Sequence, residues 1–246
     1  MPDKPILIVH PNDKTTTFLD KIKNHLIEKF DYQVHHFNIY PNEKSHNDCL
    51  ERITQSPKNG LVIFLGHGRT DKLYGSKGEF YDNSEFVSSE AKDESPDAYY
   101  YNDSFIHEGN IEVFSGKKVF CLACNSNDKI AEYAMEKGAK SFLGFGNIPT
   151  SLSEFEDKEE KVTNDVVVKM KTELNYIIKT SLVLSIANGF TFGGLLNYIH
   201  FITNQRLTDS LTNQKSFKER HVFADYLYHL KNDIKVLGDQ RSKLIE

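Results

Sequence analysis

Tryptophan is absent from this chain of 246 residues, and cysteine is scarce, with Cys49, Cys121 and Cys124 as its three thiols. An odd and small number of cysteines cannot form the disulfide framework of a secreted domain. The first residues, MPDKPILIVHP, lack the basic start and the small-residue cleavage site of a signal peptide. We therefore expect a cytoplasmic protein with free thiols, in which a cysteine in an unusual setting is a candidate nucleophile.

Extremes of charge and hydropathy are also missing. The formal net charge is -5, hydrophobic residues make up 39% of the chain, and charged residues make up 26%. This composition excludes a wholly disordered chain and a polytopic membrane protein. It gives no reason to expect a polyanionic partner, so we predict no nucleic-acid binding.

Several common ligand motifs do not occur. There is no Gly-x-Gly-x-x-Gly pattern, no Walker-type loop and no Gly-x-Ser-x-Gly elbow. The adjacent His35 and His36 would point to opposite faces of a strand, so they do not converge on a metal. We therefore predict neither a metal nor a cofactor.

Short apolar runs alternate with helical patterns over the first two-thirds of the chain. This alternation predicts βαβ units and an α/β fold with a mostly parallel sheet flanked by helices. The predicted strands are 5–10, 32–40, 61–65, 118–123 and 139–145, and the predicted helices between them are 15–30, 46–55 and 128–137. With no internal repeat or linker, we expect one domain over residues 1–246, with its core at 5–150.

Residues 151–246 are predicted to add a helical layer, with amphipathic helices over 156–176 and 222–237. Between them, Thr180–Thr203 contains no Asp, Glu, Lys or Arg and is near the length of a bilayer span. Its three glycines and two asparagines favour a helix, or a broken pair of helices, on one face of the sheet. Contact of this stretch with a membrane or a partner stays open.

An acidic insertion, residues 69–115, separates the third and fourth predicted strands. It has eleven acidic and four basic residues and no strong periodicity. We expect an irregular, partly ordered flap with a hairpin, which includes the sequence AYYY at 98–101. A cluster of charged residues most often forms nothing more than a solvated surface. A more specific hypothesis is that the insertion acts as a gate, or as a docking surface for a basic regulatory protein. Deleting Glu79 to Asp103 would test this hypothesis.

The strand ends carry the chemistry, because ligands of open parallel sheets bind beyond the carboxyl ends of the strands. The third strand ends in Gly66-His67-Gly68 and the fourth in Cys124-Asn125. An imidazole can deprotonate a thiol, and Cys124 precedes a predicted helix whose dipole would favour a thiolate. The amides of Gly68 and Cys124 could form an oxyanion hole. By contrast, Cys121 and Cys49 are expected to be buried and inert.

The segments LVIFLGHG and KVFCLACNS resemble the paired signatures of the caspase-like (clan CD) cysteine peptidases. The following AEYAMEKGAKSFLGF is similar to the CHAT-type members of that group. The resemblance covers about residues 5 to 150. It implies a caspase-like fold, a catalytic dyad of His67 and Cys124, and an oxyanion hole at Gly68 and Cys124.

The same resemblance implies where a substrate binds. Caspases carry Gln-Ala-Cys where this chain has Leu122-Ala123-Cys124, which argues against specificity for aspartate. The implied pocket residues are Asn12, Asp13, Leu122, Gly146 and Asn147. Asp13 would favour a basic residue before the scissile bond and Leu122 an apolar one, and both alternatives stay open.

The function that follows is a cysteine endopeptidase that cleaves a specific protein partner through an acyl-enzyme, with prokaryotic stress or phage defence as the setting that the resemblance implies. Two alternatives remain. One is a catalytically silent adaptor of the same fold that binds its partner through the acidic insertion. The other is a flavodoxin-like domain that binds a small molecule.

Overall fold

The structure, a computed structural model, describes residues 4–13, 15–76, 104–150 and 162–246. Its central sheet has six strands in the order β2-β1-β3-β7-β8-β9. The bounds are β1 Ile6–Pro11, β2 Val34–Ile39, β3 Leu61–Leu65, β7 Lys118–Leu122, β8 Ser141–Gly144 and β9 Lys235–Gly238. The first five strands are parallel, and β9 runs antiparallel to β8 at one edge. The predicted α/β fold with a mostly parallel sheet is confirmed.

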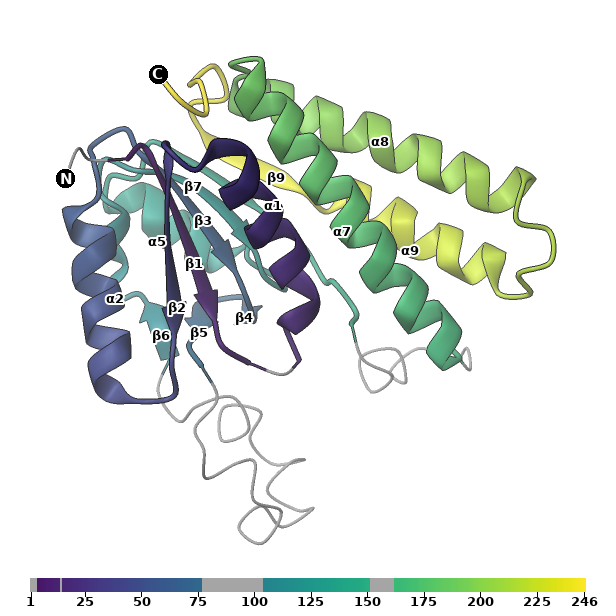
Figure 1. Ribbon diagram of the computed structural model, residues 1–246, viewed down its shortest axis with the longest axis horizontal. Coiled ribbons are helices and arrows are strands. Elements are labelled where there is room, and N and C mark those ends of the chain that lie inside the picture. Colours follow the sequence, from purple (N-terminus) through teal and green to yellow (C-terminus); the bar gives the residue numbers. More distant parts are fainter. Residues whose placement is uncertain (1–3, 14, 77–103, 151–161) are drawn as a thin grey trace, which may run out of the picture.

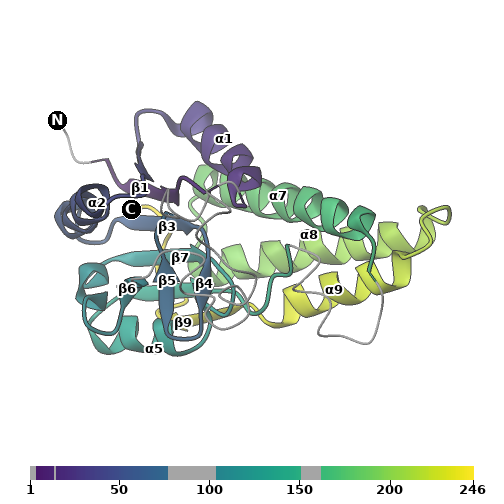
Figure 2. The same ribbon diagram turned by 90° about the horizontal axis from the view of Figure 1, so that it is seen from below.

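Helices cover both faces of this sheet (Figure 1). One face packs on α1, α7, α8 and α9, and the other on α2, α5 and a short 3-10 turn, η3. Their bounds are α1 Asp20–Phe30, α2 Glu43–Gln55, η3 Ile111–Phe114, α5 Lys129–Glu136, α7 Asn164–Ala187, α8 Phe192–Thr212 and α9 Arg220–Asn232. Figure 2 shows α7, α8 and α9 together on one side of the molecule.

The apolar strand runs explain this layering. Successive side chains of a strand point to opposite faces, so a strand covered on both sides must be apolar throughout. Ile6 and Ile8 pack into the core under α1 and α7, whereas Leu7 and Val9 pack into the core under α2. In β3 all five residues are buried. Because β1, β3 and β7 are parallel and lie between these two cores, their carboxyl ends lie at the same end of the sheet.

Two predicted helix starts were wrong. The helix predicted from residue 15 begins at Asp20, after a 3-10 turn at Thr17–Leu19. The helix predicted from residue 46 begins at Glu43, because the side chain of Asn42 accepts a hydrogen bond from the amide of Ser45 and caps it.

The helix predicted over 156–176 also has different bounds. Residues 151–161 lie outside the described residues, and α7 runs from Asn164 to Ala187 as one helix. It ends where Gly189 adopts a positive φ of 62°, and Thr191 then caps α8 through a hydrogen bond from the amide of Gly194. The uncharged stretch Thr180–Thr203 is thus a broken pair of helices. Among the described residues no helix is both long and apolar enough to cross a membrane.

The end of the chain corrects another prediction. The helix expected over 222–237 stops at Asn232, and Lys235–Gly238 forms the edge strand β9. Gly238 has a φ of 81°, and a Cβ there would lie 2.5 Å from the carbonyl oxygen of Lys140. Only glycine permits this approach, so a strand from the C-terminal part completes the sheet.

The acidic insertion is regular where it leaves and rejoins the sheet. Strands β4 Gly68–Arg69, β5 Lys72–Tyr74 and β6 Ser104–His107 form a small antiparallel sheet in that order. The expectation of an irregular segment was therefore wrong at both ends, and the expected hairpin pairing occurs between β4 and β5. Residues 77–103, with the AYYY sequence and the segment Glu79 to Asp103, lie outside the described residues.

Candidate active site

His67 and Cys124 extend two neighbouring parallel strands by the same number of residues. Leu65 in β3 is paired with Leu122 in β7, and the amide of Gly66 continues the ladder by donating to the carbonyl of Leu122 at 3.2 Å. His67 and Cys124 each follow two positions beyond this last pair. Both half-buried side chains line the same small cavity of about 20 Å³. The fold thus brings together the two residues that the sequence predicted as a dyad.

Gly68 packs directly against the cysteine segment. A Cβ at this position would lie 2.9 Å from the Cβ of Ala123 and 3.1 Å from the carbonyl oxygen of Cys124. Carbon atoms in contact are normally about 3.5–4.0 Å apart, so no larger residue fits without a shift. The absence of a side chain at Gly68 is therefore what allows the backbone after His67 to approach the backbone at Cys124.

The Cys124 thiol faces the end of β8. Its Sγ donates a hydrogen bond to the carbonyl oxygen of Ile148 at 3.4 Å. The next residue, Asn125, has a positive φ of 53°, which Asn tolerates better than most residues, and its amide donates to Gly146 at 2.9 Å. This tight turn directs the chain away from the sheet immediately after the cysteine.

Helix α5 does not act on the thiol as the sequence suggested. It begins at Lys129, five residues after Cys124, and the dipole effect is confined to the first turn. The amides of Ile130 and Ala131 already donate to the carbonyls of Thr70 and Asp128. The predicted contribution of a helix dipole to a thiolate is therefore not part of this site.

His67 is held by the loop that follows β1. Its Nε2 lies 2.5 Å from the hydroxyl oxygen of Thr15. That hydroxyl donates to Oδ1 of Asp13 at 2.6 Å, and the amide of Thr15 donates to the same oxygen at 2.7 Å. The Asp13 side chain is 3% exposed, and its Oδ2 has no hydrogen-bond partner among the described residues. A buried carboxylate thus stands behind the imidazole, with one hydroxyl between them.

The cavity beside the dyad is mainly apolar. Its walls include Phe18 and Leu19 after β1, Leu122 in β7, Ile148 after β8 and Leu174 in α7. No Asp, Glu, Lys or Arg of the described residues lines it. Of the five residues predicted to bind substrate, only Leu122 is in this wall.

The other four predicted pocket residues lie around the cavity. Asn12 is exposed, and its carbonyl accepts a hydrogen bond from the hydroxyl of Ser76 at 2.8 Å. Asp13 faces Thr15. Gly146 is buried, and a Cβ there would lie 2.5 Å from the Cβ of Asp233, whereas Asn147 is exposed.

The remaining two thiols, Cys49 in α2 and Cys121 in β7, are the core cysteines. Both are fully buried, and burial raises the pKa of each thiol far above its ordinary value. These two thiols are inert because a thiolate, the reactive form, would have to form in the apolar core in which they are packed.

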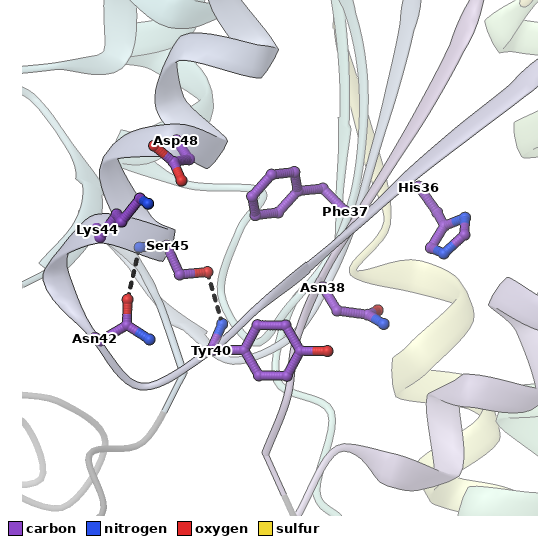
Figure 3. Close-up of a pocket in the computed structure, with 8 residues that line it drawn as sticks. All are labelled: His36, Phe37, Asn38, Tyr40, Asn42, Lys44, Ser45 and Asp48. Carbon is purple, nitrogen blue, oxygen red and sulfur yellow. Dashed lines mark hydrogen bonds between the residues drawn. The ribbon is translucent and has the colours of Figure 1, made fainter.

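A larger hollow, of about 420 Å³, lies at the edge strand β2 and the start of α2 (Figure 3). Figure 3 shows the cap of α2 there, in which Asn42 accepts from the amide of Ser45 and the hydroxyl of Ser45 accepts from the amide of Tyr40. None of the predicted site residues lines it. The part of the chain that the structure describes holds no group of three or more His, Cys, Asp or Glu suited to a metal ion.

Sequence reasoning placed Ile148 in a pocket wall after the fifth predicted strand, but it missed Thr15 and Leu174. Thr15 is one of several hydroxyl residues in the loop after β1, and only the fold shows which of them meets the histidine. Leu174 lies fifty residues after Cys124 on an apolar stripe that any covering helix would have. No local signal marked these residues.

No family model matches the chain, and no curated protein matches it. Among solved structures, a Staphylococcus aureus protein provisionally assigned as a phosphofructokinase is similar over 94% of this chain and 98% of its own. The two chains share 10% sequence identity, and their superposition has a TM-score of 0.30. A likeness at this level bears on neither the site nor the activity.

Proposed function

We propose that this protein is a cysteine endopeptidase of the caspase-like type, with Cys124 as nucleophile and His67 as proton carrier. The observation that carries the proposal is the shared cavity of these two side chains at the ends of neighbouring parallel strands, with Gly68 packed against the cysteine backbone. Its resemblance to CHAT-type peptidases suggests cleavage of one or a few partner proteins. The free thiols are consistent with the cytoplasmic location expected from the sequence.

The reaction proceeds in two stages. In the first, His67 takes the thiol proton, Sγ of Cys124 bonds to the carbonyl carbon, and the amides of Gly68 and Cys124 stabilise the oxyanion. The carbon–nitrogen bond then breaks, and the amine leaves with the proton from His67. In the second stage His67 takes a proton from water, the hydroxyl adds to the thioester, and the carbon–sulfur bond breaks as Sγ takes the proton back from His67, which restores the thiol and the neutral imidazole.

The resting thiol must change its partner for this chemistry. A hydrogen bond from Cys124 to Ile148 favours the protonated form of the sulfur, because a carbonyl oxygen cannot stabilise a thiolate. Binding of a peptide beside Ile148 would displace this bond and allow the sulfur to share its proton with the imidazole. Catalytic hydrogen bonds are commonly loose before substrate binds.

The cavity supports an apolar residue before the scissile bond. Asp13 is engaged by Thr15, so the choice left open by the sequence favours the apolar alternative of Leu122. A volume of about 20 Å³ suits a small side chain, and a larger one requires Leu174 or Phe18 to move. The acidic insertion, as a docking surface for a basic segment of the substrate or of a regulator, stays a prediction.

A fluorogenic peptide library tests the activity directly. We expect the intact protein to cleave peptides with a small apolar residue before the scissile bond, and the Cys124→Ala and His67→Ala variants to be inactive. An acyloxymethyl-ketone probe should label Cys124 only when His67 is present. Cleavage that persists in both variants, or no turnover together with labelling that ignores His67, would refute the peptidase.

Enlarging the cavity tests the specificity. Leu174→Ala should shift the preference toward larger apolar residues, because it removes one wall of the cavity. Leu182→Ala is the matched control, since Leu182 is an equally buried leucine of the same helix and does not line the cavity. Each variant should lose about 2–5 kcal/mol of unfolding free energy. A specificity that is unchanged in Leu174→Ala would show that this cavity does not receive the substrate side chain.

A further inference from the structure

The loop after β1 places a hydroxyl and a buried carboxylate in series behind His67, the proposed base. Thr15 Oγ1 contacts both Nε2 of His67, at 2.5 Å, and Oδ1 of Asp13, at 2.6 Å. A hydroxyl has one proton to give, so only one of these contacts can use Thr15 as donor. Which one it is decides where the proton of the imidazole sits.

The carboxylate of Asp13 fixes the donor and acceptor of both hydrogen bonds. An ionised carboxylate has no proton, and two oxygen acceptors at 2.6 Å would repel each other, so the Thr15 hydroxyl must donate to Asp13. The lone pair of Thr15 Oγ1 then faces His67, and Nε2 must carry the proton. In the neutral ring the lone pair is therefore on Nδ1, the nitrogen that can accept a proton from a thiol.

We infer that Asp13 and Thr15 are positioning residues that hold His67 as the Nε2–H tautomer and stabilise its imidazolium form. This inference rests on the proposed peptidase function. When Nδ1 takes the proton of Cys124, the bond from Nε2 to Thr15 persists, and the ring becomes positive a short distance from the Asp13 charge. Oδ2 of Asp13 has no hydrogen-bond partner among the described residues, and a buried acceptor left without a donor is costly, so a role for the Asp13 charge beside the imidazole would account for it.

The local sequence keeps this relay rigid. The amide of Thr15 also donates to Oδ1 of Asp13 at 2.7 Å, the hydrogen bond that is typical of an Asx turn. Thr16 adds a bond from its hydroxyl to the carbonyl of Asp13 at 3.2 Å. The Asp13 carboxylate thus has its rotamer fixed by hydrogen bonds from both the amide and the hydroxyl of Thr15.

The first test reads the proton position without any substrate. Long-range 1H–15N spectra of protein labelled with 15N-histidine, with His67 assigned by its loss in His67→Gln, should show Nε2 protonated and Nδ1 unprotonated. Thr15→Val is isosteric and should yield a mixture of tautomers, whereas Thr15→Ser should restore the wild-type pattern. A wild-type spectrum with the proton on Nδ1 would overturn the inference, whatever the activity of the protein.

The second test uses turnover. Thr15→Val should lower kcat by roughly 100-fold with little change in KM, because the variant misplaces the imidazole but leaves the bound substrate in position. Thr15→Ser should restore the wild-type kcat. Asp13→Asn should move the acid limb of the pH profile to lower pH, because the imidazolium loses a stabilising charge and His67 becomes a free base at lower pH. Asp20→Asn is the matched control, because Asp20 pairs with His10 and Lys23.

The outcomes separate the two proposals. If the Nε2–H tautomer depends on Thr15 but the protein has no peptidase activity, the proposed function is refuted, whereas the positioning of His67 by Thr15 stands. Peptidase activity with kcat and pH profile unchanged in Thr15→Val and Asp13→Asn would sink the positioning role and leave the peptidase.

Discussion

Replacing Gly68 by alanine tests the approach on which the site depends. The new Cβ would lie 2.9 Å from the Cβ of Ala123, which is about 0.6 Å or more inside normal contact. Because both carbons are fixed to backbone, the ends of β3 and β7 must separate. Overpacking of this kind costs about 1–3 kcal/mol of unfolding free energy. A displacement of 1 Å can cost about 100-fold in rate, so we expect activity to fall about tenfold or more.

Gly60→Ala supplies the comparison. Gly60 precedes β3 at its opposite end, and a Cβ there would lie 2.8 Å from the carbonyl oxygen of Pro57. Both variants should therefore show similar losses in denaturant unfolding, but only Gly68→Ala should lose peptide hydrolysis and slow the alkylation of Cys124 by iodoacetamide. If Gly68→Ala keeps the wild-type rates while losing stability like Gly60→Ala, the close approach is not required and the reasoning fails.

Three further predictions concern thiols, pH and a buried ion pair. In the native protein a thiol reagent should modify Cys124 quickly and the core cysteines only after denaturation; fast loss of a second native thiol would contradict their burial. Burial holds the pKa of His46 below its ordinary value of 6.5, so neutral His46 contributes fully to the free energy of unfolding above pH 6.5, and this contribution is lost as the pH falls. The free energy of unfolding should therefore drop less between pH 7.5 and pH 5.5 in His46→Gln than in the wild type. Arg206 donates hydrogen bonds of 2.6 and 2.7 Å to the buried carboxylate of Glu173. Arg206→Met should therefore lower the free energy of unfolding in urea by about 3 kcal/mol, because it leaves that carboxylate buried without a partner charge. Adding Glu173→Leu should recover part of the loss. A double variant as unstable as the single one would disprove that account.

The acid sensitivity of His46 has a structural consequence for the insertion. Its Nδ1 bonds to the carbonyl of Asn42 at 2.7 Å, so Nε2 is the acceptor that receives the amide of Ser76 at 3.2 Å. Protonation would turn that acceptor into a donor facing another donor. The anchor of the insertion at Ser76 should therefore loosen first on acidification, and faster hydrogen exchange at this amide would report it.

Much of the fold could be predicted because its signals are local. The strands at Leu61–Leu65 and Lys118–Leu122 are unbroken apolar runs between turn residues, and such a run is buried on both faces wherever it lies. The shared location of His67 and Cys124 could be predicted for a related reason. Parallel strands end at one edge of the sheet, so residues that follow neighbouring strands meet without any knowledge of the rest of the chain.

The failures all involve partners distant in the sequence. Lys235–Gly238 reads as the end of a helix, and it becomes a strand because β8 offers an unpaired edge and Gly238 can approach Lys140. Helix α7 continues past Tyr176 because Ile177, Ile178 and Leu182 remain buried in the core that includes α1, α8 and α9. Periodicity shows which face of an element is apolar but not which other element covers it.

The sequence by itself determined that an imidazole and a thiol each follow an apolar strand, and that parallel strands of one sheet end at the same edge. Only the tertiary structure decided what surrounds them: the hydroxyl of Thr15 behind the imidazole, the carbonyl of Ile148 against the sulfur, and Leu174 in the wall of the cavity. The hydrogen bonds join residues 52 and 24 positions apart, and such contacts form only when buried area elsewhere in the molecule offsets the entropy of ordering both segments.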